Sequence, residues 1–245
     1  MSQLSRRALL AGLASAPLLC KAFAPASSAQ TPLRVVIAGG HPGDPEYGCG
    51  GTAARFSDLG HEVTLLYLNT GQKACPDRPG DPGSTVRIAE AEKACAILKA
   101  HPKFAGQCDG HAVVDDTHYR DFQTLVEGLN PDIFFTQWPI DGHRDHRATY
   151  ALAYDTWLRM KKKFALFYYE VSDGEDTSMF SPHLYVDISQ TEARKRAACY
   201  AHASQTPDRF YALQSQVSHF RGIESGYGQA EAFIEQIGGP KVALP

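Results

Sequence analysis

The sequence predicts an α/β domain of three layers, in which helices cover both faces of a mostly parallel sheet. Short apolar runs alternate with helix-like segments after residue 30, which is typical of parallel strands joined by crossover helices. Two clusters of histidine and aspartate, at 41–46 and 141–146, each follow an apolar run directly. Ligands bind beyond the C-terminal ends of the strands in such folds, so we expect both clusters at one edge of the sheet.

The expected strands are short apolar runs, and the expected helices carry apolar residues at helical spacing. The strands are 33–38, 62–68, 112–114, 131–138, 164–171 and 184–188. The helices are 52–59, 84–99, 119–129, 146–161, 190–202 and one near 208–220. Gly60 would end the first helix and Ser84 would cap the second. Residues 48–52 are expected to form a glycine-rich turn, and 69–83, rich in Gly, Pro and Asp, a loop.

Residues 1–30 are predicted to be a twin-arginine-type signal peptide, which leaves 31–245 as the folded domain. Arg6 and Arg7 precede an apolar stretch, 8–19, that is too short to span a bilayer, and small residues follow as cleavage positions. A fraying N-terminal helix is the alternative. The signal predicts an exported protein, periplasmic or secreted, with no membrane span in the mature chain.

Charge and cysteine content exclude several classes of function. The chain of 245 residues has a formal charge of −3 and no basic stripe, which argues against a nucleic-acid partner. The glycines near residues 39–51 form no GxGxxG or Walker pattern, which argues against a phosphate-binding loop. None of the six cysteines forms a CxxC pair; Cys75 and Cys108 lie in loop-like sequence and could pair after export, whereas Cys95 and Cys199 are expected to be buried thiols.

The two clusters together predict a catalytic metal site. His41, Asp44 and His146 offer two imidazoles and one carboxylate, which leaves a coordination position open for water or substrate. Bound Zn²⁺ would lower the pKa of its water toward about 7. His143 lies three residues before His146, and Asp145 could fix the tautomer of a neighbouring imidazole. Either cluster alone would more often be a capped helix start or a solvated loop.

From about residue 33 to 233 the chain resembles the zinc-dependent deacetylases of the LmbE/PIG-L family. The resemblance rests on a strand, the His-Pro-x-Asp motif that follows it and a His-x-Asp-His motif further along the chain. It implies a Rossmann-like fold, Zn²⁺ (with other divalent metals left open) and removal of acetyl groups from N-acetylated sugars of the GlcNAc type. It also implies roles for individual residues: metal ligands His41, Asp44 and His146, oxyanion stabiliser His143, supporting carboxylate Asp145 and substrate contact Arg87.

One departure from the family pattern concerns the general base, which the resemblance places at position 43. Here that position is Gly43, which cannot accept a proton. Asp141, Glu46 and His143 are the candidate replacements, with Asp141 favoured because it leads into the second cluster. Glu46 has an alternative role as a negative charge at a helix N-terminus.

Two functions are consistent with these residues. The first is a metal-dependent hydrolase in which metal-bound hydroxide attacks the acetyl carbonyl of a small N-acetylated sugar or glycoconjugate. The alternative is a catalytically weakened or inactive sugar-binding protein on the same scaffold. The sequence leaves homo-oligomerisation open.

Overall fold

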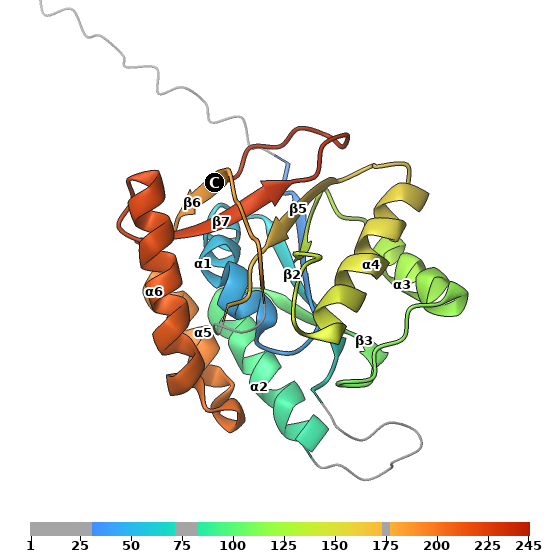
Figure 1. Cartoon of the computed structure of the whole chain (residues 1–245), viewed down its shortest axis with the longest axis horizontal. Coiled ribbons are helices and arrows are strands. Elements are labelled where there is room, and N and C mark those ends of the chain that lie inside the picture. The colour runs from blue at the N-terminus through green and yellow to red at the C-terminus, as the bar shows by residue number, and fades with distance from the viewer. Residues whose placement is uncertain (1–30, 72–82, 173–176) are drawn as a thin grey trace, which may run out of the picture. The chain divides into compact units, whose positions relative to one another are not determined.

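The computed structural model describes residues 31–71, 83–172 and 177–245, of which Pro32–Pro245 form one unit. The predicted signal at 1–30 and Cys75 lie outside the described residues. The strands are β1 (Arg34–Gly39), β2 (Glu62–Asn69), β3 (His101–Gln107), β4 (Ile133–Gln137), β5 (Ala165–Tyr169), β6 (Leu184–Asp187) and β7 (Ala230–Glu235). They form one seven-stranded sheet in the order β3-β2-β1-β4-β5-β7-β6 (Figure 1). The first five strands are parallel, and β7 runs antiparallel between β5 and β6.

Helices cover both faces of this sheet, which confirms the predicted fold class. They are α1 (Asp44–Asp58), α2 (Gly83–Leu98), α3 (Asp116–Leu129), α4 (Arg144–Arg159), α5 (Glu192–Ala201) and α6 (Pro207–Ser225), with a short 3₁₀ helix η1 (Ala203–Gln205). The helices α1, α2 and α5 pack together on one face, and α3 and α4 pack together on the other (Figure 1). None of the described helices is both long and apolar enough to cross a membrane.

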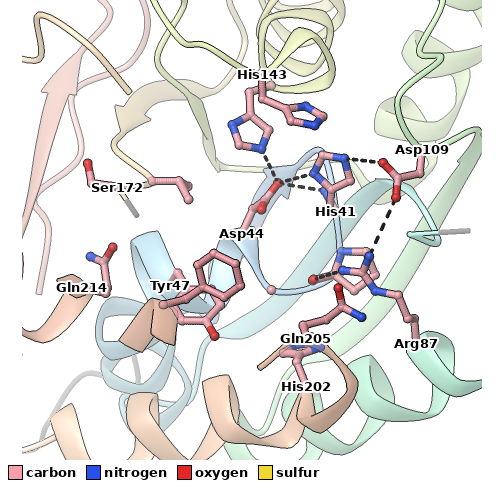
Figure 2. A pocket seen from close by; sticks show the side chains of 15 residues that line it. His41, Asp44, Tyr47, Arg87, Asp109, His143, Ser172, His202, Gln205 and Gln214 are labelled. Carbon is pink, nitrogen blue, oxygen red and sulfur yellow. Dashed lines mark hydrogen bonds and ion pairs between the residues drawn. The ribbon is translucent and has the colours of Figure 1, made fainter. Parts of the chain in front are cut away.

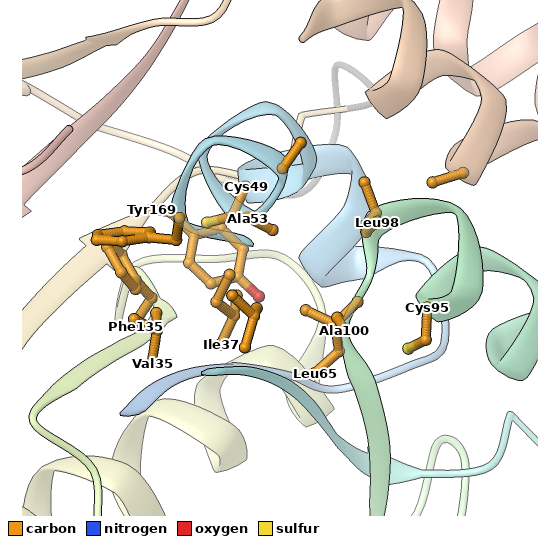
Figure 3. Packing of buried hydrophobic residues seen from close by; sticks show 14 of the residues in the cluster. Val35, Ile37, Cys49, Ala53, Leu65, Cys95, Leu98, Ala100, Phe135 and Tyr169 are labelled. Atoms are coloured by element: carbon orange, nitrogen blue, oxygen red, sulfur yellow. The ribbon is translucent and has the colours of Figure 1, made fainter. Parts of the chain in front are cut away.

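The core is divided by the sheet into two halves because successive side chains of a strand point to opposite faces. Val35 and Ile37 of β1 pack in the half beneath α1 and α2, while Val36 and Ala38 pack in the half beneath α3 and α4. Figure 3 shows the first half, where Phe135 also contributes. Burial on both faces explains why the central strands read as continuous apolar runs in the sequence.

The third strand lies elsewhere than predicted. Residues 112–114 are not a strand, and the edge of the sheet is instead β3, with the sequence HPKFAGQ. An edge strand is covered less than a central one, and β3 has no fully buried residue, so it carries no apolar run. Pro102 is tolerated there because an edge strand leaves some backbone groups unpaired.

The first helix begins eight residues earlier than predicted, so the expected glycine-rich turn at 48–52 is part of α1. The glycines are there because the helix lies very close to the sheet. A Cβ at Gly48 would come within 2.2 Å of the ring of Tyr169. This close approach outweighs the low helix propensity of glycine.

β7 was not predicted, because a glutamate interrupts its apolar pattern. Glu231 is buried and accepts hydrogen bonds from the backbone N–H groups of Gly51 (2.9 Å) and Thr52 (2.7 Å) in α1. It also pairs with Lys195 of α5 at 2.7 Å, and both side chains are almost fully buried. Glu231 therefore ties α1 and α5 to the sheet.

We expect Glu231→Gln to lower the free energy of unfolding by about 3–5 kcal/mol, because it leaves the buried Lys195 ammonium without a counter-charge. The matched control is Glu235→Gln on the same strand, whose partner Lys241 is mostly exposed. That control should cost less than about 1 kcal/mol. Urea unfolding of both variants measures the difference, and equal losses would contradict this role of Glu231.

Candidate active site

Both predicted clusters lie where β1 and β4 end side by side in the middle of the sheet. From β1 the chain turns into α1 on one face, and from β4 it turns into α4 on the other. A crevice forms at such a reversal of strand order, and ligands of open α/β sheets bind there. Gln137 holds the two strand ends together by accepting a hydrogen bond from the N–H of Gly40 at 2.9 Å.

Asp44 stands at the centre of this crevice, at the first position of α1 (Figure 2). Its Oδ2 lies 3.2 Å from His41 Nδ1 and 3.2 Å from His146 Nε2. Neighbouring ligand atoms of a tetrahedral zinc site lie about 3.3 Å apart, as follows from metal–ligand distances of about 2.0–2.1 Å. The two separations from Asp44 therefore match those between ligands of one divalent cation. His41 and His146, with His143, also offer ligand atoms that lie within 4.8 Å of one another.

The second nitrogen of each histidine is held by a carboxylate. His146 Nδ1 lies 3.0 Å from Asp141 Oδ1. His41 Nε2 lies 3.2 Å from Asp145 Oδ2 and 3.1 Å from Asp109 Oδ1. Metal-binding histidines usually donate their other N–H to such a group, which fixes the tautomer and turns the remaining nitrogen toward the metal.

The charges of the site favour a cation. Burial would lower the pKa of His146, but Asp44 and Asp141 raise it to about 9. The pKa of His41 is also raised, against burial, by Asp44 and by its hydrogen bonds to Asp109 and Asp145. Burial raises the pKa of Asp44, and the two histidines hold it well below its usual range. Without a metal the site draws positive charge onto its imidazoles, and a divalent cation could supply that charge instead.

His143 contacts the same centre but is held differently. Its ring centroid lies 4.6 Å from that of His41 and 4.8 Å from that of His146. Its Nδ1 accepts the backbone N–H of Asp145 at 3.2 Å, as the N-cap of α4. Burial and the two neighbouring histidines lower the pKa of His143. In the neutral ring the proton is therefore on Nε2, which makes His143 a hydrogen-bond donor.

A cavity of about 290 Å³ opens over these groups. Arg87 and Asp109 line it on one side, and Tyr47 and Gln214 line it on the other (Figure 2). Arg87 is fixed by the carbonyl oxygens of Pro42 (2.9 Å) and Gly71 (3.3 Å). The other lining residues are Pro42, Gly43, Val171, Ser172, His202, Gln205 and Phe210, beside the three histidines and Asp44.

Comparison with known proteins agrees with this geometry. The family model of PIG-L, GlcNAc-PI de-N-acetylase, matches residues 35–157, half of the chain. The chain belongs to the PIG-L family. The match includes α1 and the start of α4, and therefore both clusters.

Solved structures share the fold of this PIG-L protein. The conserved protein TT1542 from Thermus thermophilus is 25% identical, with a TM-score of 0.71 over 87% of this chain and 99% of that one. An N,N'-diacetylchitobiose deacetylase from Pyrococcus horikoshii is 22% identical, with a TM-score of 0.69 over 82% and 83%. GalB, the 4-carboxy-2-hydroxymuconate hydratase of Pseudomonas putida, is 17% identical, with a TM-score of 0.70 over 86% and 99%. The last two comparisons show a shared fold and nothing more.

The position of Asp141 argues against the role of general base, for which the sequence favoured it. Its side chain is fully buried, and Oδ1 accepts from His146 Nδ1 and from the N–H of His143 at 2.8 Å. Its Oδ2 accepts from the Thr177 hydroxyl at 3.0 Å. Asp141 does not line the cavity, so the geometry indicates that it orients His146.

The side chains of Glu46 and His143 also have hydrogen-bond partners already. Glu46 is fully buried and accepts from the Gly43 N–H at 3.1 Å, the Tyr67 hydroxyl at 2.8 Å and His202 Nε2 at 2.9 Å. Its role is therefore not simply that of a charge at a helix end. His143 has its Nδ1 occupied by the N–H of Asp145. None of the three expected candidates is a free proton acceptor.

Asp109 is a site residue that the sequence analysis missed. It lies just beyond the end of β3, and its carboxylate faces His41 and the cavity. The signal that could have found it is the rule that ligands gather beyond strand ends. The rule could not identify Asp109, because the sequence analysis did not recognise β3.

Gly43 is required by its backbone conformation and not by crowding, because a Cβ there would meet its nearest neighbour, Tyr47, at 3.4 Å. Its φ is +116°, a conformation that residues with a side chain rarely adopt. We expect Gly43→Ala to lower the free energy of unfolding by about 1–3 kcal/mol. The control is Gly128→Ala, in α3, where a Cβ meets nothing within 4 Å; it should raise stability by up to about 1 kcal/mol. Thermal unfolding of both variants tests this, and a stabilised Gly43→Ala would refute it.

Proposed function

We propose that this PIG-L family protein is a zinc-dependent hydrolase that removes the acetyl group from a small N-acetylated amino sugar or glycoconjugate. The observation that carries the proposal is the convergence of His41 Nδ1, Asp44 Oδ2 and His146 Nε2, with a carboxylate behind each histidine. The description of the family as a de-N-acetylase supports the reaction, and the chitobiose deacetylase shows that the fold can carry it.

A divalent cation on these three atoms would polarise a carbonyl oxygen and lower the pKa of water. The protein's own groups supply the rest. His143 Nε2–H can donate a hydrogen bond to the oxygen that becomes negative as the amide carbonyl is attacked. Arg87 and Asp109, on one wall of the cavity, offer a donor and an acceptor for the hydroxyl groups of a sugar.

Gly43 favours a second candidate, a sugar-binding protein that has lost turnover on the same scaffold. Such a protein would bind zinc and sugar and release no acetate. Turnover that appears only in Gly43→Asp would support this candidate over the enzyme.

We further propose that the protein is exported, as the twin-arginine pattern at residues 1–30 indicates. Cys108 is disulfide-bonded, whereas the other described cysteines, Cys49, Cys95 and Cys199, are free and buried. Disulfides persist mainly in oxidising compartments, which supports export.

Acetate release from a panel of N-acetylated sugars, with and without a chelator, tests the function directly. We expect release that stops on chelation and returns with Zn²⁺. His146→Ala should abolish both stoichiometric zinc and activity, because it removes a ligand. Acetate release that survives chelation, or full activity of His146→Ala, would disprove the proposal.

A finer test concerns the carboxylate behind His146. We expect Asp141→Asn to weaken zinc affinity about 10–100-fold, because His146 Nδ1 loses its charged acceptor. The matched control is Asp155→Asn, whose carboxylate pairs with Arg159 further along α4; this change should leave the affinity unchanged. Competition with a chromophoric chelator measures both, and equal affinities would rule out this role of Asp141.

A further inference from the structure

The helix α6 contributes two side chains to the wall of the cavity, Phe210 and Gln214. Residues four apart in a helix lie one above the other, so these two belong to one face of α6. Gln214 lies on the opposite side of Asp44 from Arg87 and Asp109 (Figure 2). A sugar that contacts Arg87 and Asp109 would therefore have α6 on its other side.

Gln214 is a buried amide that lines the cavity without a partner. Only 4% of the residue is exposed, and its side chain forms no hydrogen bond with the described residues. Buried polar side chains are nearly always hydrogen-bonded, because an unpaired donor or acceptor costs free energy. An amide donates and accepts, as does the hydroxyl group of a sugar. Gln214 is therefore placed to bind a hydroxyl group of a ligand.

One turn of α6 before Gln214, the cavity wall is aromatic. The rings of Phe210 and Tyr47 meet edge to face, with their centroids 6.4 Å apart. The hydroxyl oxygen of Tyr47 is shielded from solvent, so Tyr47 presents ring carbons to the cavity. Two of these carbons lie 3.4 and 3.6 Å from where a Cβ at Gly43 would be. Glycine at position 43 therefore leaves this part of the ring uncovered.

These groups match the two kinds of surface that a pyranose ring offers. Its C–H bonds make the face of the ring apolar, and the hydroxyl groups around its edge form hydrogen bonds. The aromatic wall also lies near the proposed metal site, because Tyr47 follows Asp44 by three residues on the same face of α1. In an N-acetylated sugar the nearest ring carbon is only two bonds from the acetyl carbon, so the ring must lie this close.

The size of the cavity fits one sugar ring. Its volume of about 290 Å³ is at the lower end of the range for small-molecule sites, roughly 300–1,000 Å³. A ring whose acetamido group reaches Asp44 would fill much of this space. It would therefore contact the wall formed by α6.

We propose that Phe210 and Gln214 of α6, together with Tyr47 of α1, bind the sugar ring of an N-acetylated pyranose; this inference rests on the proposed deacetylase function. The apolar face of the ring packs on Phe210 and Tyr47, and Gln214 forms a hydrogen bond with one of its hydroxyl groups. The acetamido group is thereby directed toward Asp44. These residues determine which N-acetyl compounds are accepted, and they take no part in the chemical step.

The competing explanation is that Phe210 and Gln214 only pack α6 against its neighbours. Gln214→Leu separates the two, because leucine keeps most of the buried bulk and loses the hydrogen bond to the sugar. We expect KM for N-acetylglucosamine to rise about 3–10-fold, with kcat within about twofold and zinc content unchanged. Tm should stay the same or rise, because the protein without sugar loses an unpaired buried amide. The matched control is Gln216→Leu, an exposed residue of the same helix, which should leave KM unchanged.

Phe210→Leu tests the aromatic wall in the same way. We expect KM to rise about 3–10-fold, because a sugar face loses its contact with the ring. Phe210→Tyr keeps the ring and should restore most of the affinity. The matched control is Phe220→Leu, also on α6, which is 53% exposed and outside the cavity and should change neither KM nor kcat. Steady-state acetate release measures KM and kcat of all these variants, and thermal unfolding measures Tm.

An unchanged KM in either Gln214→Leu or Phe210→Leu would overturn the inference. So would a rise in KM that accompanies a falling Tm in Gln214→Leu, or one that persists in Phe210→Tyr. These outcomes leave the deacetylase proposal standing. No acetate release by the unaltered, zinc-loaded protein from any N-acetylated sugar would overturn both.

Discussion

The structure depends on one constraint, that imidazoles and carboxylates buried at the edge of the sheet must be paired with one another. Unpaired, each would carry a large desolvation penalty. Asp145 meets the constraint across several elements: it accepts from His41, from Asn69 at the end of β2 and from the N–H groups of Gly110 and Ala112 beyond β3. One fully buried carboxylate thereby joins the ends of β1, β2 and β3 to the first turn of α4.

The same requirement explains how α1 is placed. Asp44 could ligate a metal only if the start of α1 is held in place to within about 0.2 Å. Close packing of Gly48 on Tyr169 sets the distance between helix and sheet, and the buried Glu231 fixes the middle of the helix through its backbone N–H groups. Glu46 and His202 fix its first turn. Residues far from the cavity therefore determine the geometry within it.

Holding a metal and moving a proton would be separate tasks in the proposed reaction. The residues proposed for the first task are all present, and both histidines among them have a supporting carboxylate, whereas the side chain that the family resemblance assigns to the second is replaced by Gly43. The shared fold does not decide which reaction a site performs, since a chitobiose deacetylase and a muconate hydratase both have it. The decision rests with the local groups that line the crevice.

The sequence by itself determined the three-layer fold, the central strands and both histidine–aspartate clusters, because buried parallel strands read as apolar runs and the clusters directly follow two of them. It did not reveal β3 or β7, whose patterns are broken by edge exposure and by Glu231. It also gave Asp141 a role that only contacts could decide: a carboxylate beside a cluster in sequence can face the cavity or lie behind a histidine. Whether a polar group is free or engaged depends on partners distant in the chain. For that reason only the tertiary structure showed that Asp141 and Glu46 are fully paired with other residues.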